Sequence, residues 1–114
     1  MAITFTTDKL QGLPTSVAGV YARIQSVTVK KYDATSDPDV AVQWRCLYDV
    51  VLHASAAVRN ASGEYPEWGN RLNCREIDHF TCTYDPTSNS NPYAQAYADL
   101  KTKIASIASS ITDA

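Results

Sequence analysis

The segment from residue 40 to residue 52 constrains the fold most, because its apolar and polar positions alternate. Every even position is apolar or aromatic, whereas Gln43, Arg45 and Asp49 hold odd positions; the even set is Val40, Val42, Trp44, Cys46, Tyr48, Val50 and Leu52. A period of two kept over this length is typical of a β-strand with one buried face. Leu47 and Val51 interrupt the polar face, which predicts that this face is partly covered.

Three more segments read as strands. Residues 3–7 alternate, residues 17–32 are rich in Val, Ile, Thr and Tyr, and residues 71–84 place Leu72, Cys74, Phe80, Cys82 and Tyr84 on one face. In this last segment Glu76 and Asp78 intrude on the apolar face, so its middle is expected to bulge or point outward, with Ile77 on the other face.

The second of these segments changes phase. Val20, Ala22 and Ile24 share one face, but Val27 and Val29 fall on the other. Two explanations are open: a β-bulge near residues 25–26 restores the register, or both faces are covered, the outer one by another subunit.

The C-terminal part predicts a helix over about residues 92–111. Asn91 suits the N-cap and Pro92 the first helical position. An apolar stripe follows at helical spacing, made of Tyr93, Tyr97, Leu100, Ile104, Ile107 and Ile111. We expect the stripe to cover the sheet and complete the core; the alternative is a coiled-coil seam between subunits.

These elements predict one α+β domain over residues 1–114. A twisted antiparallel sheet of about four to five strands, within residues 1–84, is covered by one C-terminal amphipathic helix. Residues 54–60 can add a helical turn. The loop that follows holds Tyr65, Pro66 and Trp68, which form either a small satellite core or a contact patch.

Charge and composition argue against several classes of function. Net charge is −2, and the largest basic cluster is the pair Lys30 and Lys31, so no nucleic-acid partner is expected. No apolar run reaches the length of a membrane span, and the N-terminus does not resemble a signal peptide. We therefore expect synthesis in a cytoplasm and no membrane partner.

The three cysteines, Cys46, Cys74 and Cys82, all fall on apolar faces. Buried thiols that pack as small hydrophobic groups are the favoured interpretation. Cys74 and Cys82 are too far apart along one extended strand to bridge each other, whereas Cys46 could pair with either, or a thiol could bridge two subunits.

Catalytic chemistry has weak support in the sequence. Glu76, Asp78 and His79 are adjacent, and His53 is the other histidine, but His79 points away from the two carboxylates on a strand. A solvated strand edge explains the three residues better than a metal or catalytic site. No nucleophile elbow, phosphate loop or metal motif is present. We therefore expect no enzyme, no cofactor and no metal.

The chain resembles small virion proteins of tailed bacteriophages. The resemblance is carried by the opening Met-Ala-Ile-Thr-Phe, by residues 20–24 (Val-Tyr-Ala-Arg-Ile) and by residues 91–97 (Asn-Pro-Tyr-Ala-Gln-Ala-Tyr). It covers nearly the whole chain, except for the aromatic loop and the cysteines, and carries over no catalytic residue. It implies a component of the tail, baseplate or collar that is held in the virion by neighbouring subunits.

The expected function is therefore structural, through contacts with other virion proteins and with further copies of the chain. A capsid decoration protein, or a small module that inhibits a host protein, is the alternative. An enzyme that uses Glu76, Asp78 and His79 is a third class. The candidate interface residues are aromatic or lie beside aromatics: Tyr65, Pro66, Trp68, Tyr93 and Tyr97.

Overall fold

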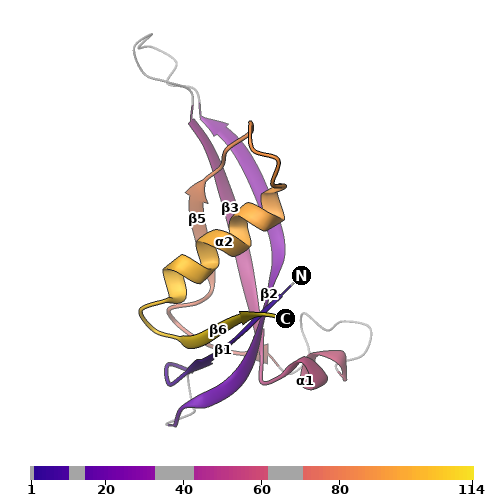
Figure 1. The fold of residues 1–114 in the computed structure, drawn as a ribbon, viewed down its shortest axis with the longest axis vertical. Coiled ribbons are helices and arrows are strands. Elements are labelled where there is room, and N and C mark those ends of the chain that lie inside the picture. Colours follow the sequence, from indigo (N-terminus) through magenta and orange to yellow (C-terminus); the bar gives the residue numbers. More distant parts are fainter. Residues whose placement is uncertain (1, 11–14, 33–42, 62–70) are drawn as a thin grey trace.

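The protein, seen in a computed structural model, is described over residues 2–10, 15–32, 43–61 and 71–114. These residues form a mixed α+β fold in which a six-stranded sheet carries a C-terminal helix (Figure 1). The elements are β1 (Ile3–Thr7), β2 (Val17–Tyr32), β3 (Gln43–His53), α1 (Ala56–Asn60), β4 (Arg71–Leu72), β5 (His79–Thr83), α2 (Pro92–Ile104) and β6 (Ser109–Asp113). The predicted fold class is confirmed, although the described sheet has six strands rather than four to five.

All strand pairs are antiparallel, in the order β4-β3-β2-β1-β6. β4 and β5 pair with the same edge of β3. β4 lies opposite the C-terminal end of β3, and β5 lies opposite its middle and N-terminal part. The longest pairing joins β2 to β3, and these two strands run along the long axis of the molecule (Figure 1). Residues 40–42 of the alternating segment lie outside the described residues.

A β-bulge explains the phase change in β2. Ile24 lies opposite Val50, but the next pair is Ser26 with Asp49, so Gln25 is an extra residue on β2. Beyond the bulge, Val27 lies opposite Tyr48 and therefore faces the same side as Ile24. The bulge near residues 25–26 is thus confirmed.

The pairing of β1 is irregular on both sides at the same level. On the β2 side the register shifts between Phe5 and Thr7, next to Gly19 with φ 71°. On the β6 side it shifts between Thr4 and Thr6, next to Ser110 with φ 52°. Bulges of this kind increase the local twist, so the sheet bends around β1.

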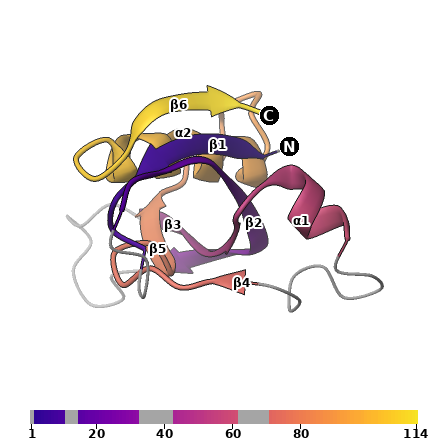
Figure 2. The same cartoon turned by 90° about the horizontal axis from the view of Figure 1, so that it is seen from below.

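The helix α2 packs on the inner face of the sheet, against β2, β3 and β5. Figure 2 shows it behind β1 and β6. Its buried residues are Ala96, Tyr97, Leu100 and Ile104, and they join a core that includes Phe5, Val20, Ile24, Tyr48, Val50 and Leu52. The expectation that the stripe completes the core is confirmed for this part of α2.

The predicted helix was too long at its C-terminal end. It ends at Ile104, and the chain turns through residues 105–108 into β6. Ile107 and Ile111 still pack against the core, but from the turn and from a strand. The physical reason is composition, because Ser, Thr and β-branched residues from Ser106 onward favour turns and strands over helix, and β1 offers an edge for pairing.

Residues 71–84 do not form one strand, which corrects the prediction. They form β4, a turn through residues 73–78, and β5. Inside the turn Ile77 is 3% exposed, although strand alternation placed it on the outer face. The carbonyl of Asp78 accepts a 2.7 Å hydrogen bond from the N–H of Val50. The turn therefore provides a hydrogen-bond acceptor for β3 in the gap between β4 and β5.

The expected helical turn is α1, capped by Ser55, whose side chain accepts from the N–H of Val58. It contacts β2 and β3. Nearby, Val51 and His53 on the outward-facing side of β3 are buried, which confirms partial cover of that face. No helix among the described residues is both long enough and apolar enough to cross a membrane.

Candidate functional site

The outward-facing side of the sheet beyond the bulge is its most distinctive surface. Three strands contribute three side chains each, and we call the set the outer grid: Ser26, Thr28, Lys30, Arg45, Leu47, Asp49, His79, Thr81 and Thr83. Eight of these residues are exposed and Leu47 is half-buried. The opposite side of the same three strands lies under α2. Within the described residues, the outer grid is therefore the uncovered side of this part of the sheet.

Strand register aligns the outer grid in three rows across β2, β3 and β5. Directly opposed residues in antiparallel strands project to the same side, so each row is a line of neighbours. The basic row is Lys30, Arg45 and Thr83; the middle row is Thr28, Leu47 and Thr81; the acidic row is Ser26, Asp49 and His79. The bulge at Gln25 brings Ser26, rather than Gln25, opposite Asp49.

Cross-strand hydrogen bonds hold the charged groups of the outer rows. Arg45 donates from Nη1 to Oγ1 of Thr83 at 3.3 Å, and Ser26 donates from Oγ to Oδ2 of Asp49 at 2.7 Å. Each bond uses one part of a multivalent group, because a guanidinium has five N–H donors and a carboxylate two acceptor oxygens. Both groups can therefore bind a partner without leaving their own row.

Charge is divided between the two ends of the outer grid. Lys30 and Arg45 make one end positive. At the other end stands Asp49, and Asp78 lies 3.3 Å from Nδ1 of His79. The middle row between them is uncharged. A depression of about 210 Å³ lies over the middle and acidic rows, including Leu47, Asp49 and Thr81. Such a surface suits protein contact by charge and hydroxyl complementarity.

The inner side of the same strands carries a polar cluster that fastens α2. Tyr48 donates to Oδ2 of Asp99 at 2.6 Å, and Lys103 pairs with the same carboxylate. Lys103 also donates to the carbonyl of Thr81 at 2.7 Å and lies over the ring of Phe80. Burial, together with the hydrogen bond to Asp99, raises the pKa of Tyr48 far above its usual range. The phenol stays protonated and serves as a donor.

The three cysteines are buried, as the sequence predicted, and none of them is bridged to another within the chain. Cys46 and Cys82 are direct cross-strand partners. Burial first, and the neighbouring Cys82 second, raise the pKa of Cys46 to about 11. Burial also raises the pKa of Cys74 and Cys82. Because the thiolate is the nucleophile, thiols held in this state at neutral pH are poor reagents, and the pair acts as packing.

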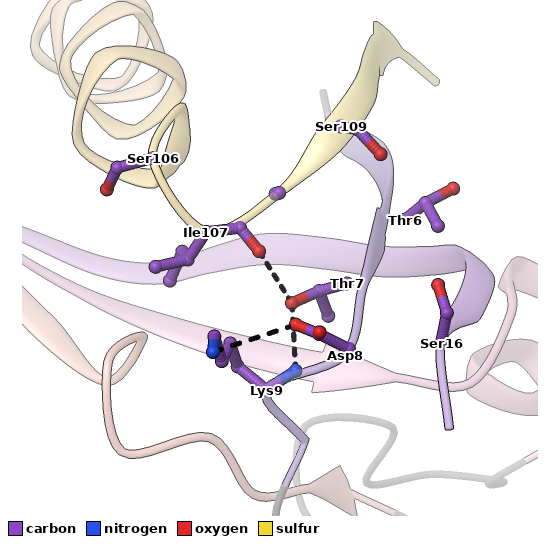
Figure 3. Close-up of a pocket in the computed structure, with 9 residues that line it drawn as sticks. Thr6, Thr7, Asp8, Lys9, Ser16, Ser106, Ile107 and Ser109 are labelled. Carbon is purple, nitrogen blue, oxygen red and sulfur yellow. Dashed lines mark hydrogen bonds and ion pairs between the residues drawn. The ribbon is translucent and has the colours of Figure 1, made fainter. Parts of the chain in front are cut away.

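An open groove lies where β1 ends and the turn after α2 begins (Figure 3). Its volume is about 470 Å³, and hydroxyl side chains dominate its lining, with Asp8 and Lys9 at the rim. Thr7 is 3% exposed and donates to the carbonyl of Ile107 at 2.8 Å, while accepting from the N–H of Lys9 at 3.2 Å. These bonds tie β1 to the turn, which is a structural role.

The structure divides the predicted interface residues into three groups. Tyr65, Pro66 and Trp68 lie outside the described residues. Tyr93 is 45% exposed, which keeps it available for contact. Tyr97 is 4% exposed and accepts a 2.8 Å hydrogen bond from the N–H of Ile24, so its prediction as an interface residue is corrected. Helical spacing alone could not distinguish the exposed Tyr93 in the first turn of the stripe from the buried Tyr97 in the next.

The acidic cluster remains at the surface. Glu76, Asp78 and His79 are all exposed, and Glu76 accepts a 3.4 Å hydrogen bond from the thiol of Cys74. His53 is buried in β3. Among the described residues, no three carboxylate, imidazole or thiol groups are placed to hold a metal ion.

Sequence reasoning missed the outer grid as a unit. The signal present in the sequence was the run of alternate Ser, Thr and charged residues on the polar face of each strand. It could not show that β5 pairs with this part of β3, because it predicted one strand with a bulged or outward-pointing middle rather than two strands separated by a turn. Comparison with protein-family models, curated proteins and solved structures identified no match.

Proposed function

We propose that this protein is a structural component of a tailed-phage particle, in the tail, baseplate or collar, and that it acts through protein contacts. The observation that carries the proposal is the outer grid: an ordered, uncovered side of a sheet whose other side is closed by a helix. The resemblance of residues 20–24 and 91–97 to small virion proteins supports a place in a tailed-phage particle.

The outer grid has the properties of a surface that recognises another protein. Its hydroxyls sit on strands rather than on loops, so little backbone has to be ordered when they bind. Its charges are spread at two ends, which fixes the orientation of a partner more than it adds affinity. A surface of this kind suits a subunit that is positioned among neighbours in an assembly.

The sheet edge at β6 supports contact through the face rather than through strand addition. β6 is short, it contains the irregular Ser110, and Lys101 pairs with Asp113 beside it. Short, bulged and charged edges discourage a further strand from pairing. At the β6 edge, contact through the uncovered face is therefore favoured over strand addition.

The test is to infect host cells with the phage that encodes the chain and to follow the protein through particle purification. We expect it in purified particles at a fixed copy number, and a Leu47→Arg variant to be depleted from them. The matched control, Ala98→Arg on the exposed side of α2, should be incorporated normally. Attachment to tails supports the proposal, whereas attachment to empty heads would indicate a decoration protein.

Recovery of the protein only in the soluble fraction, bound to a host protein, would overturn the proposal in favour of an inhibitor module. A turnover reaction abolished by alanine at Glu76, Asp78 and His79, with the fold retained, would instead reveal an enzyme.

A further inference from the structure

We propose that the outer grid binds the outer grid of a second copy of this chain, face to face about a two-fold axis. This pairing identifies a second copy of the chain as one partner of the outer grid. It rests on the proposed function only because both use the same face of the sheet. It makes a separate prediction, because it concerns the purified protein in solution.

The charge pattern of the outer grid is self-complementary. Lys30 and Arg45 mark one end of the outer grid, Asp49 marks the other, and the uncharged middle row lies halfway. In a two-fold interface each surface meets a rotated copy of itself. A surface that is positive at one end and negative at the other is complementary to its own reversed copy.

The charges also select the direction of the two-fold axis. If the axis runs along the middle row, β3 of one copy lies antiparallel to β3 of the other, and each basic row faces an acidic row. Arg45 then meets Asp49 of the second copy, twice per interface. An axis along the strands would place Arg45 over its own counterpart, where like charges repel. The antiparallel arrangement is therefore the one we infer.

Side-chain size is compatible with this arrangement. Packed sheets lie about 10 Å apart, a gap that an extended Arg and a carboxylate can close together. At the centre, Leu47 would meet Leu47 of the second copy on the axis. It is the apolar member of the grid and is half-buried, so pairing would remove its remaining apolar surface from water.

The size of the grid sets the strength of the pairing. A stable interface usually takes about 20–30 residues from each partner, and the grid is much smaller. We therefore expect a weak dimer in solution, with a dissociation constant on the order of hundreds of micromolar. In a particle that holds many copies, tethering raises the effective concentration and makes a weak contact sufficient.

The first experiment is a charge exchange, followed by sedimentation equilibrium across a concentration series up to about millimolar. We expect wild type to dimerise, Arg45→Asp and Asp49→Arg each to weaken dimerisation by about tenfold or more, and the double variant to recover it. The matched controls make the same charge changes at the groove, Lys9→Asp and Asp8→Arg, and should dimerise as wild type does. Circular dichroism checks that every variant is folded.

The second experiment tests the axis directly. A residue on a two-fold axis meets its own counterpart, so Leu47→Cys should give a covalent dimer with a bis-maleimide cross-linker whose reach spans the gap of about 10 Å between packed sheets. Ala98→Cys on α2 is the control and should stay monomeric. The native cysteines should not interfere, because all three are buried.

The outcomes separate the two proposals. A wild-type monomer at every concentration, with no Leu47→Cys dimer, overturns the pairing; if that monomer still enters particles, the proposed function stands. A dimer in which the double variant fails to recover shows that Arg45 and Asp49 do not meet, and it overturns the inferred axis. A charge-dependent dimer absent from particles leaves the pairing and removes the proposed function.

Discussion

The hydroxyl of Tyr97 in α2 accepts a 2.8 Å hydrogen bond from the backbone N–H of Ile24 in β2. Ile24 lies immediately before the bulge, and β1 already begins opposite Ala22. Its N–H faces the side where the neighbouring strand is missing. Because a buried N–H without a partner is costly, the phenol substitutes for a strand and fixes α2 over the bulge.

Replacing Tyr97 by Phe should therefore destabilise the protein. The ring keeps its packing, but the N–H of Ile24 loses its acceptor, and we expect a loss of about 1–3 kcal/mol in the free energy of unfolding. Urea denaturation followed by circular dichroism measures it. Tyr93→Phe is the matched control, because this exposed hydroxyl is in the same helix; its stability should match that of wild type. Equal stability of the two variants would contradict the assigned role.

The bond from Tyr48 to Asp99 leads to a second prediction. Tyr48→Phe should lower the free energy of unfolding by about 1.5–3 kcal/mol, since a hydrogen bond to a charged acceptor is lost. Asp99→Ala should also be destabilising, and the two changes together should cost less than their sum. A double-mutant cycle isolates this coupling. Strictly additive effects would show that the two groups do not stabilise one another.

The sequence predicted those parts of the fold that depend on local pattern. Alternation located β1, β2 and β3, the phase change located the bulge, and the Asn91-Pro92 pair located the start of α2. Each signal arises from neighbouring residues on one element. Burial of Cys46 and Cys82 followed for the same reason, since both alternate with polar residues on strands.

The parts that failed depend on contacts between distant segments. Ile107 and Ile111 continue a helical period, yet Ile111 lies in β6, because that segment pairs with β1. Ile77 is buried because the turn after β4 folds under β3, which no local period reveals. The outer grid needs the register of three strands at once, so its residues were visible singly but not as a surface.

The left-handed backbone positions beside β1 give a third prediction. Gly19 has φ 71° and Ser110 has φ 52°, and residues with a Cβ are disfavoured there by roughly 1–2 kcal/mol. Gly19→Ala should destabilise the protein by about that amount, although the space around the added Cβ is open. Ser110→Gly should stabilise it by less, because glycine also loses more backbone entropy on folding. Thermal unfolding compares both with wild type; changes of the same sign would argue against backbone strain.

The buried thiol of Cys46 predicts how stability changes in alkali. Its pKa is about 11 in the folded protein and 9.0 without the fold. Between these values the folded state holds a proton that the unfolded state has released, so the free energy of unfolding falls as pH rises from 9 to 11. Cys46→Ala lacks this group and should show a shallower decline, by about 2 kcal/mol over the range.

A matched control separates titration from packing. Val50→Ala removes buried volume from the same strand and the same core, without removing a titratable group. It should lower stability at every pH, with a decline parallel to that of wild type. Urea denaturation in reducing buffer at steps from pH 8 to pH 11 provides the three curves. Parallel decline in Cys46→Ala and wild type would mean that the thiol is not protected in the fold, and it would place Cys46 in contact with water rather than between β3, β5 and α2.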